Sequence, residues 1–276
     1  MNRTTASCCF AILLATACGG NGGGHADAGA RGPDAMFCPA LPDAGTPGAA
    51  SGDVSGTWAV QSKTLAQVQG FGGAQLAVSS WLLKITQTGT DLTVVETMCS
   101  LKIDSVDGNT KVRVTPAYIA AVPPENRTGS IVDDGAGGYT FTLDENYIVR
   151  GATLTDEIND PLPTDASDPR VGDWDMDGNP GVTLLIDGVL SGKAYVVQRD
   201  HSQYTGAQID ANRVEGREVW GSEENYLGSD PPQIATLASH AFPDPDPSKH
   251  TFVMVHLDDN ADCAFVTTNA CSLFPE

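Results

Sequence analysis

The chain has 276 residues, of which 41% are hydrophobic, so it can bury a core as one large domain or two small ones, which excludes disorder of the whole chain. Its 35 acidic residues outnumber its 15 lysines and arginines and give a formal net charge of −20. Such a charge repels phosphate groups, so we expect no nucleic-acid partner and no electrostatic adhesion to anionic lipid headgroups.

The first seventeen residues have the layout of an export signal. Arg3 supplies a positive charge, and Cys8–Ala15 is an apolar run too short to span a bilayer. Leu14–Cys18 resembles the lipobox of bacterial lipoproteins, although Ala15 stands where that family most often has leucine. The resemblance implies lipidation of Cys18 and a membrane anchor in the cell envelope, periplasmic or on the cell surface. The three residues before Cys18 also fit ordinary secretory cleavage, so plain secretion is the alternative.

Residues 18–52 form a predicted flexible tether, because Gly, Ala, Asp and Pro dominate there. From residue 53 to 276 we expect one all-β domain. Short β-branched and apolar runs between turn residues predict strands at 54–62, 81–86, 92–98, 111–115, 139–143, 147–150, 182–186, 193–198, 203–209, 213–222 and 251–256. Helical turns are expected only at 65–70 and at 232–240.

Successive hairpins without long helices favour an antiparallel meander, and closure into a single up-and-down barrel would remove its edge strands. The run Ser55-Gly56-Thr57-Trp58 resembles the G-x-W start of lipocalins and other calycin barrels. The resemblance implies a lipocalin-like barrel in which Trp58 plugs one end and Arg199 or Arg217 covers its ring. A β-sandwich is the alternative fold, and an ordinary core position is the alternative for Trp58.

The connection from residue 152 to 180 is rich in aspartate and contains a D-x-D-x-D-G pattern. Its members are Asp173, Asp175, Asp177 and Gly178. Alternate carboxylates of this kind converge on a hard cation, and the carbonyl of Asn179 would add a further oxygen. The run resembles the calcium loops of secreted β-proteins, whereas the closing glutamate of an EF-hand loop is missing. We therefore expect a structural Ca²⁺, with a solvated acidic turn as the alternative.

Four cysteines follow the predicted signal and lipidation site, and an even number in an exported domain favours two disulfides. We expect Cys263–Cys271, which would close a short C-terminal loop, and Cys38–Cys99, which would attach the tether to the domain. Three pairings are possible, and free thiols are the alternative. Zinc is disfavoured because no C-x-x-C spacing is present.

The sequence contains no G-x-S-x-G, H-E-x-x-H or phosphate-binding glycine motif. Four acidic residues near one strand offer candidate paired carboxylates for glycoside hydrolysis, namely Glu215, Glu218, Glu223 and Glu224. Our first expectation is a non-catalytic module that binds a small apolar ligand in the mouth of a barrel. A structural or adhesive surface protein and an extracytoplasmic hydrolase are the alternatives.

Overall fold

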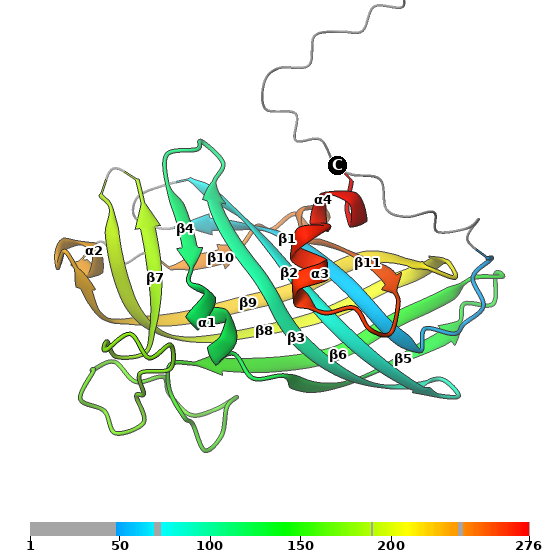
Figure 1. Cartoon of the computed structure of the whole chain (residues 1–276), viewed down its shortest axis with the longest axis horizontal. Helices are drawn as coiled ribbons and strands as arrows, with labels where there is room; N and C mark the ends of the chain where they lie inside the picture. Colours follow the sequence, from blue (N-terminus) through cyan, green and yellow to red (C-terminus); the bar gives the residue numbers. More distant parts are fainter. Residues whose placement is uncertain (1–47, 69–72, 189, 237–239, 276) are drawn as a thin grey trace, which may run out of the picture. The chain divides into compact units, whose positions relative to one another are not determined.

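The computed structural model describes residues 48–68, 73–188, 190–236 and 240–275 (Figure 1). Strands dominate these residues: β1 (Gly56–Val68), β2 (Ala74–Thr88), β3 (Asp91–Ser105), β4 (Lys111–Val114), β5 (Glu125–Asp133), β6 (Tyr139–Arg150), β7 (Val182–Asp187), β8 (Gly192–Asp210), β9 (Arg213–Asp230), β10 (Ala241–Pro243) and β11 (Thr251–Leu257). The helices are short: α1 (Pro116–Ala121), α2 (Gln233–Thr236), α3 (Cys263–Thr268) and α4 (Ala270–Leu273), with a 3₁₀ turn at Pro247–Lys249.

Within the described part of the chain, eight strands close into a ring of antiparallel hydrogen-bonded pairs. The order around the ring is β1, β2, β3, β5, β6, β8, β9 and β11, and β11 pairs back onto β1. Apart from the three short strands, this is the order of the chain itself. The predicted all-β antiparallel meander is therefore confirmed.

The ring is not a regular barrel, which corrects the lipocalin-like regularity that we expected. At one end β4 pairs with β3, β7 pairs with β8, and β4 and β7 pair with each other. On one side, β3 thus pairs with β5 through its first part and with β4 through its last part, and β8 pairs with β7 through its first part and with β6 beyond it. The short β10 pairs with the last residues of β1, beyond those that pair with β11.

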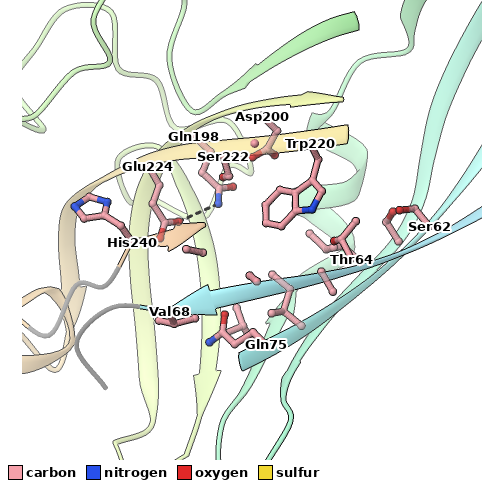
Figure 2. Close-up of a pocket in the computed structure, with 18 of the residues that line it drawn as sticks. Ser62, Thr64, Val68, Gln75, Gln198, Asp200, Trp220, Ser222, Glu224 and His240 are labelled. Carbon is pink, nitrogen blue, oxygen red and sulfur yellow. Dashed lines mark hydrogen bonds between the residues drawn. The ribbon is translucent and has the colours of Figure 1, made fainter. Parts of the chain in front are cut away.

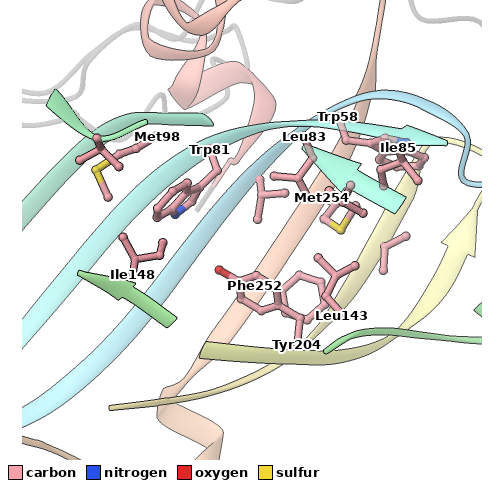
Figure 3. Packing of buried hydrophobic residues seen from close by; sticks show 14 of the residues in the cluster. Trp58, Trp81, Leu83, Ile85, Met98, Leu143, Ile148, Tyr204, Phe252 and Met254 are labelled. Atoms are coloured by element: carbon pink, nitrogen blue, oxygen red, sulfur yellow. The ribbon is translucent and has the colours of Figure 1, made fainter. Parts of the chain in front are cut away.

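One half of the ring is filled by apolar side chains, among them Trp58, Leu83, Phe252 and Met254 (Figure 3). Trp58 is fully buried and donates its indole N–H to the carbonyl of Val54 at 2.9 Å. Pairing of β1 with β11 places His256 directly opposite, and its ring lies edge-on at 4.9 Å from that of Trp58.

The predicted arginine over Trp58 is wrong in this structure. Arg199 donates to backbone carbonyls of the long acidic connection, at Glu157 and Asp160, and Arg217 donates to the carbonyl of Pro247. His256 takes the place that the lipocalin resemblance assigns to an arginine, because β11 rather than a strand bearing an arginine lies beside the start of β1.

Local predictions at two helical stretches also differ from the structure. The expected turn at 65–70 is strand as far as Val68, because its residues continue the pairing of β1 with β2. The expected helix at 232–240 is confined, among its described residues, to Gln233–Thr236. No helix in the described ranges is long and apolar enough to cross a membrane.

The end of the predicted tether contacts the domain. The backbone N–H groups of Ser51 and Gly52 donate to the side chain of Gln208, and Ala49 forms a bridge with Asp210. The predicted signal peptide, Cys18 and Cys38 lie outside the described residues.

A disulfide joins Cys99 of β3 to Cys263 at the start of α3, with Cα atoms 4.9 Å apart. Neither predicted pairing, Cys263–Cys271 or Cys38–Cys99, is therefore formed. The physical reason is the position of α3, which packs on β2 and β3 through a small apolar cluster. This places Cys263 over a residue 164 positions away in the sequence rather than beside its near neighbour.

Candidate functional site

The other half of the ring encloses a cavity of about 520 Å³ (Figure 2). Its floor is formed by residues that also belong to the apolar core, among them Trp81, Met98, Ile148 and Tyr204. Because side chains alternate between the two faces of a strand, every second residue of the long strands points into this space. On β1, for example, Ser62, Thr64, Ala66 and Val68 line the cavity.

The two walls of the cavity differ in chemistry. The wall formed by β1 to β4 and β7 carries mainly small or apolar side chains, such as Ala66, Ala77, Leu101, Ile103, Val112 and Ile186, with Thr64 and Gln75 among its polar exceptions. The wall formed by β6, β8 and β9 carries mostly polar ones. The cavity is therefore amphipathic, with an apolar side facing a polar side.

Strand register arranges the polar wall in rows that run across three strands. One row is Arg150, Gln198 and Glu224, the next is Ile148, Asp200 and Ser222, and the third is Asn146, Ser202 and Trp220. All nine residues line the cavity. We call this set the polar grid. Adjacent residues within the polar grid lie about 5 Å apart across the strands and about 7 Å apart along a strand.

Two carboxylates of the polar grid are differently paired. Asp200 forms a salt bridge with Arg150, yet its side chain is 34% exposed, because it faces the cavity. Glu224 accepts hydrogen bonds from Gln198 and from the hydroxyl of Tyr226, each at 3.2 Å. Both partners of Glu224 are neutral, and burial raises the pKa of this carboxyl.

A third carboxylate, Glu218, lies deeper, next to the core. It accepts a hydrogen bond from Ser62 of the opposite wall, and burial raises its pKa to about 7. Nearby, the buried ion pair of Arg127 and Glu96 has its nitrogen and oxygen 2.9 Å apart, and Arg127 also donates to the carbonyl of Ser202. The polar grid therefore rests on a buried, hydrogen-bonded layer rather than on apolar side chains alone.

Two successive hydrogen bonds hold the ring of Trp220 in place. Its indole N–H donates to Nδ1 of the buried His250 at 3.1 Å, and Nε2 of His250 donates to the carbonyl of Asp244 at 2.8 Å. This chain fixes the ring at the edge of the polar grid, beside the small residues of β1 (Figure 2).

Two buried donors of the polar grid have no hydrogen-bond partner among the described residues: Nε of Arg150 and the side-chain nitrogen of Asn146. An unpaired buried donor costs about 1–3 kcal/mol. Arg150 is only 2% exposed, and both side chains line the cavity. Because neither atom has accessible surface, an acceptor in the cavity would reach them only when a side chain beside them turns.

The aspartates of the D-x-D-x-D-G pattern come together, as predicted. Oxygen atoms of Asp173, Asp175 and Asp177 lie within 4.8 Å of one another, and the group could hold a metal ion. The turn that brings them together has left-handed backbone at Met176, with φ of 53°, and at Gly178, with φ of 86°. Asn179 lies against the group and donates to Asp177 through both its backbone and its side chain.

The loop is attached to the sheet at Thr183, the second residue of β7. Its backbone N–H donates to Asp175 at 3.0 Å and its hydroxyl donates to Asp177 at 2.8 Å. Asp175 is only 4% exposed, and its second oxygen, Oδ1, has no partner in the described part of the chain. Burial, opposed by the Thr183 N–H and assisted by the charges of Asp177 and Asp173, raises the pKa of Asp175.

Sequence reasoning grouped four glutamates, and the structure separates them. Glu218 and Glu224 point into the cavity, whereas Glu215 and Glu223 lie outside it and pair with Arg213 and Arg199. Glu218 and Glu224 lie an even number of residues apart on β9, so their side chains point to the same face of the strand. This signal can be used only once the strand is known. The sequence did not identify the cavity-lining residues of β6 and β8, because a run of polar residues is typical of a turn rather than of a strand.

Comparisons of the chain with protein-family models, with curated proteins and with solved structures find no match.

Proposed function

We propose that the domain is a non-catalytic binding module that holds a small, partly apolar molecule in the cavity. The observation that carries this proposal is the cavity itself, in which an apolar wall faces a polar one. Its volume of about 520 Å³ falls within the range of about 300–1,000 Å³ typical of small-molecule sites. A ring filled throughout by side chains would instead favour the structural or adhesive alternative.

The proposal is tested with N-phenyl-1-naphthylamine, a neutral apolar dye whose fluorescence rises in dry surroundings. We expect saturable binding of one dye per chain. Ala77→Trp, which places a large ring in the cavity, should abolish binding, because Ala77 lines the apolar wall. Leu76→Trp is the matched control, since Leu76 precedes it on β2 and is 38% exposed. Absence of saturable binding, or equal binding by the Ala77→Trp variant, would contradict the proposal.

We also propose that Asp173, Asp175 and Asp177 hold a structural Ca²⁺. The buried, unpaired oxygen of Asp175 supports this, because a buried carboxylate oxygen requires a partner, and a hard cation between three carboxylates would supply one. The ion would neutralise the three charges and fix the loop where it meets Thr183 of β7.

Calcium should therefore stabilise the fold. For the affinities typical of extracellular sites, 10 mM Ca²⁺ is expected to add about 1–3 kcal/mol to the free energy of unfolding. The measurement is urea unfolding with and without Ca²⁺. The increment should vanish in Asp175→Asn and persist in Asp165→Asn, which changes an aspartate of the same loop whose carboxylate accepts from Ser167. An equal increment in all three proteins would refute this site.

A hydrolase is a second candidate function, favoured by the three carboxylates Asp200, Glu218 and Glu224 in one cavity. Raised pKa values of buried carboxyls are common at catalytic sites. Release of nitrophenol from nitrophenyl glycosides, lost on Glu218→Gln, would establish this function in place of simple binding.

A further inference from the structure

The polar grid restricts what the polar end of a ligand can be, and this inference rests on the proposed binding function. Among the described residues that line the cavity, the acidic ones are Asp107, Asp200, Glu218 and Glu224, whereas Arg150 is the one arginine and no lysine is present. Arg150 is itself paired with Asp200. Within the described lining, no arginine or lysine is thus left unpaired to receive an anionic head, which disfavours a ligand such as a fatty acid or a phosphate.

The same grid does not fit a simple cation. Its unpaired buried groups are donors, Nε of Arg150 and the amide nitrogen of Asn146, and neither can bind an ammonium group. They need an acceptor. Arg150 also stands in the same row as Glu224, with Gln198 between them, so a cation placed against Glu224 would lie near a guanidinium charge.

Hydroxyl groups meet both requirements, because each hydroxyl donates one hydrogen bond and accepts others. In the polar grid, β6 contributes the donors Arg150 and Asn146, whereas β8 and β9 contribute the carboxylates Asp200 and Glu224 and the hydroxyls Ser202 and Ser222. The face of Trp220, fixed by its bond to His250, offers a flat apolar surface for the C–H side of a ring.

We infer that the polar end of the ligand is an uncharged, hydroxyl-rich ring of the sugar type, bound on the polar grid, and that an apolar part of the same molecule lies against β1 to β3. The ligand class is therefore a glycoside with an apolar substituent. Hydroxyl oxygens of the ring would accept from Asn146 and Arg150, and hydroxyl hydrogens would be donated to Asp200 and Glu224.

The test compares three amphiphiles that share an octyl chain and differ only in the head: octyl glucoside, nonanoate and octyltrimethylammonium. Isothermal titration calorimetry is carried out on the full chain, below micelle-forming concentrations. We expect octyl glucoside to bind at least tenfold more tightly than the other two. Tighter binding of the anion or of the cation would overturn the sugar inference and leave the proposed binding function standing. Failure of all three to bind, together with failure of the dye, would overturn both.

Variants separate hydroxyl recognition from charge recognition. Asn146→Leu removes a donor and should weaken octyl glucoside about threefold to tenfold. Glu224→Gln keeps an acceptor but removes the charge, so affinity should change less than threefold, whereas a cationic head would lose more than tenfold. Trp220→Ala should weaken binding, and Val219→Ala, its outward-facing neighbour that is 62% exposed, is the control. Thermal melting confirms that each variant is folded, and unchanged affinity in both Asn146→Leu and Trp220→Ala would refute the inference.

Discussion

Glu218 shows at the scale of one residue how the cavity differs from an ordinary core. Its carboxyl group lies between the two walls, bonded to Ser62, and burial raises its pKa to about 7. An unfolded glutamate has a pKa of about 4.3. Between these two values the folded chain binds more protons than the unfolded chain, so the contribution of Glu218 to stability is complete below about pH 4 and is lost as the pH rises towards 7.

This predicts a pH dependence that Glu218→Gln removes. The free energy of unfolding is measured in urea from pH 4.5 to 8 for both proteins, which cancels the effect of other carboxyls. Relative to the variant, the wild type should lose about 2–3 kcal/mol between these limits, with most of the change below pH 7. A difference that stays constant with pH would show that Glu218 titrates normally in the fold.

Single residues also show what could be predicted. Asp173, Asp175 and Asp177 were identifiable because all three ligands lie within one turn, so their spacing alone brings them together. Glu223 and Glu224 are neighbours in the sequence, yet only the second lines the cavity. Nothing local distinguishes them. The difference depends on which face of β9 points inward, and that is set by pairing with distant strands.

At the scale of elements, two glycines face each other where β8 pairs with β9, and their lack of side chains lets a ring from β11 pack directly against the two strands. Gly206 lies opposite Gly216, and the ring of Phe252 from β11 packs over the pair. A Cβ atom on Gly216 would lie 2.3 Å from the carbonyl oxygen of Thr205 and 2.7 Å from the Phe252 ring. Neither the backbone nor a fully buried ring can move away easily.

Gly216→Ala should therefore destabilise the domain by about 1–3 kcal/mol through overpacking. Chemical denaturation measures the loss. Gly48→Ala is the matched control, because its new Cβ would meet only a methyl group at an ordinary 3.5 Å. Equal free energies of unfolding for the two variants would mean that β8 and β9 can move slightly apart without loss of stability.

Strand prediction succeeded for most strands with an apolar face, whereas it missed β5 entirely and interrupted β8 at the cavity. Strand β8 was predicted in two pieces, 193–198 and 203–209, separated at Arg199–His201, whereas it runs unbroken through Gly192–Asp210. The missing piece contains Asp200, which faces the cavity. Polar residues on the inner face remove the hydrophobic alternation by which a strand is identified, so the predicted gap falls where the binding wall lies.

At the scale of the whole molecule, the closed ring and the disulfide were beyond local prediction. Closure depends on β1 meeting β11, about 190 residues later, and the Cys99–Cys263 bond spans 164 positions. The antiparallel meander could be predicted because consecutive strands pair. Contacts between the ends of the chain leave no comparable trace in a single sequence.

The predicted anchor concerns the whole molecule as well. We expect the protein made in a bacterial host to fractionate with membranes and to be extracted by detergent, because several acyl chains on one cysteine anchor stably. Cys18→Ala should move it to the soluble fraction. Detergent-free release of the unaltered protein would favour plain secretion.

We propose above all that the cavity bordered by Trp81, Met98 and Tyr204 is open and binds a ligand. A crystal structure of the protein grown with octyl glucoside tests it most directly. We predict one molecule inside the ring, its octyl chain along β1 to β3 and its sugar ring on the polar grid near Asn146 and Trp220. A cavity closed by inward-turned side chains, with octyl glucoside bound only on the outer surface, would contradict the claim.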